Sequence, residues 1–285
     1  MSRVVLCLGS GGVGKTTTSA ALALALADRG ERVMVLTIDP ARRLADALGL
    51  RGQLSNEPTL VSDLGGDAAG RGGGEVWAAM LDPALTFRQV IESEATSPEQ
   101  AERILRNRLF LNLTTTLSGT NEYMAAERLH QLDRDPRFDR IIVDTPPSRH
   151  VLDFLDSPGR LSRFVDHRLY RSVLAPRIGV LRPMTAASRA AMRLLARLVG
   201  SSLVEDVVTF FADFEGMDTG FQRRARDIDA LLTGPDTTYL LITGPRVDRI
   251  DEATWILDNL ERRDRRADAL VVNRVLPFAS ADGPD

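Results

Sequence analysis

Apolar residues in this chain occur in short runs that alternate with segments of helical periodicity. The helical pattern covers Thr16–Arg29, Pro83–Glu94, Glu99–Asn112 and Asn121–Leu132. The short runs have the length of buried strands and lie at Val4–Leu8, Arg32–Ile38, Glu75–Leu81, Arg140–Val143, Thr238–Thr243 and Ala269–Val272. Strands that alternate with helices form parallel sheets, because each crossover returns the chain to the same end of the sheet. The pattern predicts an α/β fold: a doubly wound, mostly parallel sheet flanked by helices, with a helical insertion.

The segment from residue 157 to residue 204 differs in composition from the rest of the chain. It carries nine arginines and one acidic residue, Asp166, and is otherwise rich in apolar side chains. Arg189, Arg193 and Arg197 recur every four residues, so a helix would place them on one face. Such a basic amphipathic helix suits a membrane surface, an apolar helix or an acidic partner. A packed helix with a solvated arginine face explains the pattern equally well.

Composition and charge exclude several classes of protein. The net charge of the 285 residues is −3, so we expect no nucleic-acid partner. Cys7 is the only cysteine, which excludes a disulfide framework and a cluster of cysteines within one chain. No apolar stretch reaches the length of about 18 residues that a membrane-spanning helix needs. We expect a cytoplasmic protein, with peripheral contact at a membrane left open.

One glycine-rich loop carries a motif with a known chemistry. Residues 9–16 read Gly-Ser-Gly-Gly-Val-Gly-Lys-Thr and fit the P-loop pattern G-x-x-x-x-G-K-[ST]. In a P-loop, backbone N–H groups wrap the phosphates, and the next helix adds its N-terminal dipole. Lys15 is the only lysine in the chain, and its compact charge suits the β/γ-phosphates better than a guanidinium does. The nucleotide-binding residues predicted from this loop are Gly11, Gly12, Val13, Gly14, Lys15, Thr16 and Thr17.

A dinucleotide-binding loop is the alternative for the same glycines. Gly9, Gly11 and Gly14 also fit G-x-G-x-x-G, and Asp39 follows the second predicted strand, where such a fold has its ribose-binding acid. The Lys-Thr pair after the last glycine has no role in that fold. The apolar strand that ends at Asp144 is typical of a nucleotidase, because an acid there holds Mg²⁺. Together these features favour the P-loop.

Further segments resemble one family of P-loop proteins. Gly11–Thr17 is similar to the deviant Walker A motif of the SIMIBI class, and residues 37–48 resemble switch I of the ArsA-like ATPases. These are the arsenical-pump ATPases and the guided-entry targeting factors for tail-anchored membrane proteins. Residues 144–150 resemble switch II of that family. Ser118–Glu122 resembles its turn before a helix, and Val271–Arg274 the strand whose asparagine reads adenine.

The resemblance implies ATP and Mg²⁺ as cofactors and a role for each matching residue. Lys15 would be catalytic and bind the β/γ-phosphates, while the hydroxyl of Thr16 would bind Mg²⁺. Asp39 would be catalytic by orienting or activating the attacking water. Asp144 would hold Mg²⁺ through water, and Asn273 would contact adenine. Hydrolysis of this kind is positioning plus charge neutralisation, with the metal bridging phosphate oxygens. His150 fits either a switch residue or an ordinary loop residue.

The chain also departs from the family. Ser10 stands where the deviant motif has a lysine that reaches the partner's nucleotide across a dimer, and no other lysine can replace it. We expect the missing charge to come from Arg42 or Arg149, or from a related lysine-bearing subunit. A single cysteine supplies neither a metalloid site nor a zinc-bridged dimer. Residues 276–285 are too few for the strand, loop and helix that the family usually has there.

The expected function is a dimeric switch. We expect residues 1–285 to form a single P-loop ATPase domain with a helical subdomain inserted at about 84–132 and 155–232. ATP hydrolysis would be coupled to a client, either an apolar helix or a membrane-associated protein. The dimer partner would be the same chain or a lysine-bearing relative. A weakly hydrolysing subunit of a heterodimer is the first alternative. A partitioning-type ATPase on membrane or DNA is the second, and the acidic end Asp282–Asp285 disfavours it.

Overall fold

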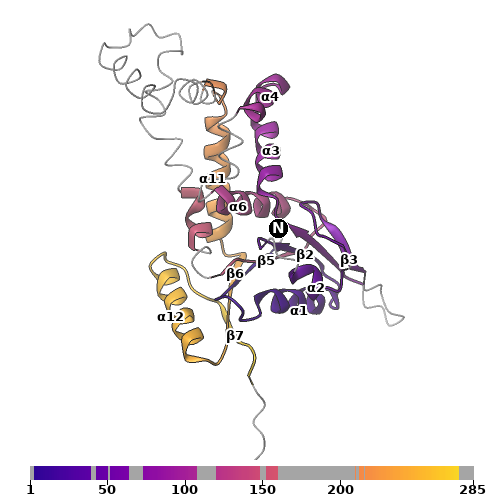
Figure 1. Ribbon diagram of the computed structural model, residues 1–285, viewed down its shortest axis with the longest axis vertical. Coiled ribbons are helices and arrows are strands. Elements are labelled where there is room, and N and C mark those ends of the chain that lie inside the picture. Colours follow the sequence, from indigo (N-terminus) through magenta and orange to yellow (C-terminus); the bar gives the residue numbers. More distant parts are fainter. Residues whose placement is uncertain are drawn as a thin grey trace, which may run out of the picture. The chain divides into compact units, whose positions relative to one another are not determined.

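The computed structural model divides the chain into two compact units. It describes residues 3–39, 43–50, 52–63, 73–107, 120–147, 152–159, 209, 212–214 and 216–275. The sheet unit comprises Met1–Leu81, Gln131–Leu152 and Thr233–Asp285, and the helical unit comprises Asp82–His130 and Asp153–Leu232. Figure 1 labels the elements of both.

The sheet unit is built on seven strands. Their order across the sheet is β3-β4-β2-β5-β1-β6-β7, and all neighbours are parallel except the pair β3 and β4. The predicted fold class, a doubly wound and mostly parallel sheet flanked by helices, is confirmed. The strands are β1 Arg3–Leu8, β2 Arg32–Thr37, β3 Thr59–Asp63, β4 Glu75–Met80, β5 Arg140–Asp144, β6 Thr237–Thr243 and β7 Ala269–Val272.

The register of the central strands brings three loops to one edge of the sheet. Cys7 of β1 lies opposite Asp144 of β5, and Thr37 of β2 lies opposite Asp144 on the other side. On its far side β1 pairs with β6, where Cys7 lies opposite Leu240. The strands next to β1 in space are therefore distant in sequence. Ligands of such folds bind at the carboxyl ends of strands, close to the point where the strand order reverses.

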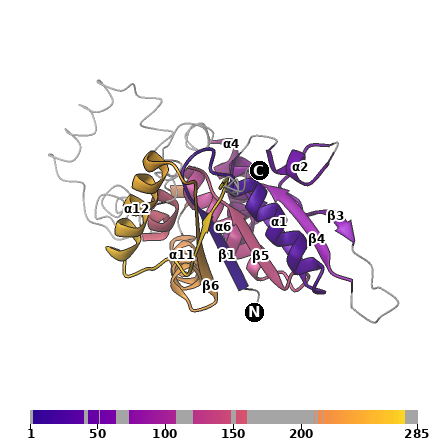
Figure 2. The same cartoon turned by 90° about the horizontal axis from the view of Figure 1, so that it is seen from below.

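A small-residue helix covers the centre of the sheet. Helix α1, Lys15–Ala27, contacts β2 and β5, and its buried face is made of small side chains such as Ser19, Ala20 and Ala23. Figure 2 shows α1 lying alongside the strands of the sheet. Cys7 is fully buried in the same core, and this burial raises the pKa of its thiol to about 12. The cysteine is therefore a packed core residue.

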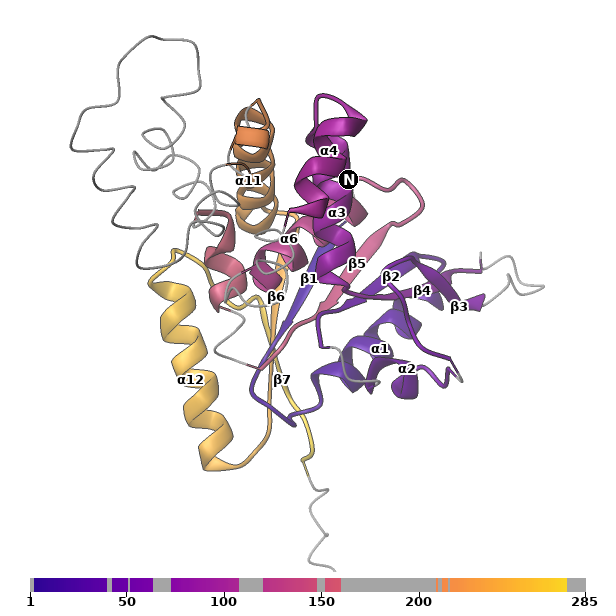
Figure 3. The same cartoon turned by 45° about the horizontal axis from the view of Figure 1, so that its top comes forward.

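The sheet unit also contains elements that the sequence pattern did not predict. They are β3, the short helix α2 at Arg43–Ala47 and helix α12 at Val247–Glu261, which packs on β6 (Figure 3). Strand β3 is a polar edge strand, paired antiparallel with β4 through an irregular register between Leu60 and Ser62. Gly74, just before β4, is buried. A Cβ on Gly74 would lie 2.2 Å from the backbone oxygen of Ala27.

The helical unit contains helices α3, α4, α6 and α11, visible in Figure 1. Two have side-chain N-caps, because Asp82 Oδ1 accepts from Leu85 N at 2.9 Å and Ser97 Oγ accepts from Gln100 N at 3.3 Å. Asn107 is extended, so α4 ends before the predicted Asn112. The helices are α3 Pro83–Glu94, α4 Pro98–Arg106, α6 Thr120–Asp133 and α11 Asp218–Thr233. A further helix covers residues 152–159. The last turn of α6 belongs to the sheet unit.

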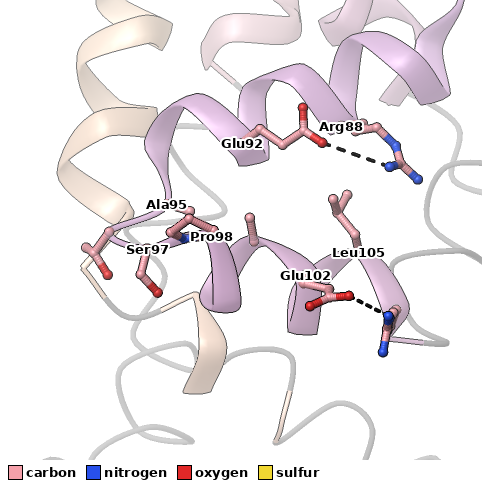
Figure 4. A pocket seen from close by; sticks show the side chains of 10 residues that line it. Arg88, Glu92, Ala95, Ser97, Pro98, Glu102 and Leu105 are labelled. Carbon is pink, nitrogen blue, oxygen red and sulfur yellow. Dashed lines mark ion pairs between the residues drawn. The ribbon is translucent and has the colours of Figure 1, made fainter.

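A pocket of about 700 Å³ lies between α3 and α4 (Figure 4). Its walls carry the ion pairs Arg88–Glu92 and Arg106–Glu102, each within one helix. None of the residues predicted to bind nucleotide lines it. Within the described residues, no helix has the length and apolar character needed to cross a membrane.

Several sequence predictions fall outside the described residues. They concern the basic stretch from residue 160 onward with Arg189, Arg193 and Arg197, the switch I residues Pro40, Ala41 and Arg42, the switch II residues Ser148, Arg149 and His150, the turn at Ser118 and Gly119, and residues 276–285.

Candidate functional site

The loop between β1 and α1 has the close backbone packing that its glycines predict. Gly14 is the N-cap of α1 at φ 96° and ψ 27°, and a Cβ there would lie 2.2 Å from Asn273 Nδ2. Gly9 has φ 151°, and its Cβ would lie 2.2 Å from the backbone oxygen of Ile242. By contrast, a Cβ on Gly11 or Gly12 would meet no atom within 4 Å. The loop is packed tightly on its sheet side and open on the other.

The start of α1 lacks a local group to satisfy its backbone donors. Gly14 provides no side-chain cap, and the first turn of the helix carries no acidic residue. The first N–H groups of a helix have no partner inside the helix, and the helix dipole makes this end positive. The opening beside Gly11 and Gly12, together with this helix terminus, is suited to an anion such as a phosphate.

Lys15 begins α1 and folds back over the loop. Its side chain is buried, and Nζ donates to the backbone oxygens of Gly9 and Ser10, each at 3.0 Å. Burial lowers the pKa of Lys15, while the charges of Asp144 and Asp39 act in the opposite direction. The ammonium group is therefore held at the loop by neutral carbonyls, and no carboxylate of the described residues bonds to it directly.

Asp144, at the end of β5, faces the first turn of α1. Its Oδ2 accepts from Thr16 Oγ1 at 2.8 Å and from Thr37 Oγ1 at 3.4 Å. The other oxygen, Oδ1, is buried and has no hydrogen-bond partner among the described residues. Burial raises the pKa of Asp144, and the hydrogen bond from Thr16 partly offsets that effect. A buried carboxylate oxygen without a partner, close to a threonine hydroxyl, fits Mg²⁺, which prefers oxygen ligands and is usually bound by one or two carboxylates plus phosphates.

Asp39 follows β2, at the same edge of the sheet. Its carboxylate pairs with Arg43 Nη1 at 3.3 Å, and its side chain is one-quarter exposed. The hydroxyl of Thr37 lies 3.4 Å both from the backbone oxygen of Asp39 and from Asp144 Oδ2, so the two acidic residues are close neighbours. The structure thus brings together Lys15, Thr16, Asp39 and Asp144.

Asn273 approaches the phosphate loop from the end of β7. Its Nδ2 donates to the backbone oxygen of Val13 at 2.9 Å, and its Oδ1 accepts from Arg274 N at 2.8 Å. The side chain that was predicted to contact adenine therefore supports the loop. Thr17, the last of the loop residues predicted from the sequence, is exposed on the first turn of α1.

Besides the bond from Asn273 to Val13, two contacts at the site were missed by the sequence reasoning. The hydroxyl of Thr37 is a second donor to Asp144. Arg249, in the first turn of α12, donates from Nη1 to Ser10 Oγ at 3.3 Å. The sequence reasoning had named Arg42, Arg149 or a lysine-bearing subunit for the charge that the family's lysine supplies across a dimer, and it gave no role to Arg249. The position of Arg249 just after the predicted strand Thr238–Thr243 was the available signal, but it becomes informative only once β6 is known to lie beside β1.

Comparison with known proteins gives consistent results. The family described as "Anion-transporting ATPase" matches residues 2–284. An "ATPase ASNA1 homolog" of Cryptosporidium parvum is 26% identical over 279 residues, which are 97% of this chain and 66% of that protein. An "ATPase get3" of Schizosaccharomyces japonicus is 25% identical over 271 residues, 94% of this chain and 73% of that protein. An uncharacterised Streptomyces coelicolor protein is 27% identical over 278 residues, 96% of this chain and 63% of that protein. The chain spans about two thirds of the length of these relatives.

Proposed function

The chain belongs to the anion-transporting ATPase family, and from this membership we propose that it is a Mg²⁺-dependent ATP-binding and hydrolysing switch protein. One observation carries the proposal. The buried Lys15 and the Thr16–Asp144 pair lie beside an open glycine loop, at the carboxyl ends of β1 and β5. A lysine, a hydroxyl and an acid in this arrangement are the protein groups that phosphoryl transfer needs.

Each residue of the loop has a role in the proposed reaction. The backbone of Gly11, Gly12, Val13 and Gly14 and the hydroxyl of Thr17 bind phosphate oxygens. Lys15 exchanges its bonds to the carbonyls of Gly9 and Ser10 for bonds to the β- and γ-phosphates. This exchange costs little, because the ammonium already lies in the loop.

Asp144, Asp39 and Asn273 complete the proposed site. Thr16 and Asp144 would hold Mg²⁺, with Asp144 acting through water, and when bound the ion neutralises charge on the phosphates. Asp39 orients the attacking water or accepts its proton. Asn273 contacts adenine while supporting the loop through Val13.

The two units have different roles in this proposal. The sheet unit is the P-loop ATPase domain, and the helical unit is the subdomain inserted at about 84–132 and 155–232, near the observed division. Nucleotide state would change a dimer of this chain, or of this chain with a lysine-bearing relative, in the cytoplasm. The client would be an apolar helix or a membrane-associated protein that meets the basic segment of the insertion.

A weakly hydrolysing subunit of a heterodimer is the second candidate. It is favoured by Ser10, whose side chain is buried and bonded to Arg249 instead of extending from the loop as a lysine would. Phosphate release by the chain alone and with candidate partner subunits separates the two candidates. A rise of at least about tenfold with a partner, about 1.4 kcal/mol in the barrier, would favour the heterodimer.

Replacement of Lys15 tests the proposed function. We expect Lys15→Ala to weaken binding of ATP with Mg²⁺ by about a hundredfold, because two charge-assisted bonds to phosphate are lost. Equilibrium titration with a fluorescent ATP analogue measures this, and phosphate release measures turnover. The matched control is Arg29→Ala, which removes an exposed cation just beyond the end of α1 and should change neither. Wild-type affinity in Lys15→Ala would disprove the proposal.

A further inference from the structure

Two cationic side chains converge on Ser10, and only one of them belongs to the loop motif. Lys15 Nζ donates to the backbone oxygen of Ser10 at 3.0 Å, and Arg249 Nη1 donates to its hydroxyl oxygen at 3.3 Å. Ser10 itself is 3% exposed, so the guanidinium reaches into the base of the loop. A second positive charge therefore stands at the phosphate loop.

The fold fixes the position of Arg249. Strand β6 pairs directly with β1, and α12 begins at Val247, shortly after β6 ends at Thr243. Thr243 Oγ1 donates to the backbone oxygen of Arg249 at 2.9 Å, which ties the first turn of α12 to the end of β6. The backbone of Arg249 is thus anchored to the strand next to the one that leads into the loop.

The other partners of Arg249 are weakly held. Nη1 also donates to Glu252 Oε2 at 3.0 Å, and Nε lies 3.7 Å from Asp248 Oδ2. Both acidic side chains are about half exposed, at 47% and 53%, and the arginine side chain is 34% exposed. Exposed ion pairs contribute little to stability, so the guanidinium can exchange a carboxylate for a phosphate at small cost.

We propose that Arg249 is a phosphate-binding residue of the ATP site, contributed by α12, and that it binds the terminal phosphates together with Lys15. The inference rests on the proposed function. A P-loop lysine reaches the β- and γ-phosphates, and Arg249 meets Lys15 at the same residue, Ser10. The planar guanidinium has five donors and binds phosphate oxygens in pairs. Because ATP carries the additional terminal phosphate, Arg249 favours ATP over ADP.

The test compares two arginines at the start of α12. Arg249→Gln removes the charge at the loop. Arg246→Gln removes an exposed charge that pairs with Asp248 and makes no described contact to the loop. We expect Arg249→Gln to weaken ATP binding by about tenfold or more, as for loss of a hydrogen bond to a charged group. ADP binding should fall less, and Arg246→Gln should leave both affinities within about twofold. Calorimetric titration in the presence of Mg²⁺ measures all of them.

The outcomes separate this inference from the proposed function. If the wild-type chain does not bind ATP, the proposed function fails. If the wild type binds ATP and Arg249→Gln binds it equally well, only the assignment of Arg249 is wrong. Equal losses for ATP and ADP also overturn it, because the residue would then not distinguish the terminal phosphate. If circular dichroism shows that Arg249→Gln does not fold, the Arg249→Lys variant provides the test instead. It keeps the charge without the fork, and an unchanged ATP-to-ADP affinity ratio would overturn the assignment.

Discussion

In the helical unit Arg224 lies between two carboxylates, whereas in the sheet unit Lys15 and Asp144 are bonded by neutral groups. Arg224 donates to Glu94 and to Glu127, each at 2.6 Å, and the side chains of these acids are 9% and 0% exposed. Lys15 donates to two carbonyls and Asp144 accepts from two hydroxyls. Within the described residues no ion pair joins these last two charges.

The difference separates a structural charge from a functional one. A buried charge that is paired with its opposite is compensated, and removing one partner leaves the other uncompensated. A buried charge held by neutral dipoles remains able to attract a charged ligand. In the helical unit the ion pairs of Arg224 with Glu94 and Glu127 therefore connect α11 to α3 and α6. In the sheet unit Lys15 and Asp144 are held by neutral groups and so remain able to attract charged ligands.

The largest expected effect comes from removing the paired cation. Arg224→Met should reduce the free energy of unfolding by about 3–5 kcal/mol, because the buried Glu94 and Glu127 would both lose the cation that they contact at 2.6 Å. Urea denaturation monitored by circular dichroism measures this. The neighbouring Arg223 contacts Glu94 at 3.4 Å with a 64% exposed side chain, so Arg223→Met should cost less than about 1 kcal/mol. Equal losses of stability in the two variants would contradict the interpretation of Arg224 as a structural charge.

An intermediate effect should appear when a ligand is added. ATP with Mg²⁺ at a hundred times its dissociation constant should stabilise the wild-type chain by about 2.7 kcal/mol. Lys15→Met should show no such gain. Without ligand, its stability should stay within about 1 kcal/mol of wild type, since the ammonium is desolvated and forms no ion pair within the part of the chain that the structure describes. Thermal denaturation with and without ATP tests both. A large loss of stability in ligand-free Lys15→Met would mean that Lys15 is structural, as Arg224 is.

The smallest expected effect concerns Asp144 and pH. Burial raises its pKa in the folded chain above the unfolded value of about 3.9. The folded chain therefore binds more protons between the two pKa values, and stability falls as pH rises through that window. Without ligand at pH 7, Asp144→Asn should be more stable than wild type, because the amide carries no charge that burial would desolvate. Its stability should also change less with pH.

Denaturation curves over a pH series, with Mg²⁺ chelated, measure this effect. A ligand-free Asp144→Asn variant that is less stable than wild type at pH 7 would contradict the interpretation. Added ATP with Mg²⁺ should reverse the order of the two proteins, because the variant lacks the carboxylate for the ion.

Local pattern was enough to predict most of the sheet and the phosphate loop. The strands β1, β2, β5 and β6 are almost continuously apolar because both faces of a parallel sheet are covered. The loop motif is contiguous in sequence, so its residues needed no knowledge of the fold. Strand β3 was missed because it is a short edge strand with several polar residues, and α12 was missed because acidic and other polar residues interrupt its apolar ones.

Contacts between distant segments could not be predicted. Arg249 and Ser10 are 239 positions apart, and Asn273 and Val13 are 260 apart. They meet because β6 and β7 are added to the sheet on the β1 side, an order that no local pattern encodes. The family resemblance implied that Asn273 contacts adenine, whereas its bond to the loop could not be foreseen for the same reason.

The single lysine has a practical consequence. Since the chain holds only one ε-amino group, a sample labelled with isotope on lysine alone will give one side-chain ammonium signal in an NMR spectrum, and that signal comes from the phosphate loop. Amine-reactive reagents can modify the same buried site and otherwise only the amino terminus. The protein therefore contains its own spectroscopic reporter of nucleotide occupancy, with no need for an introduced probe.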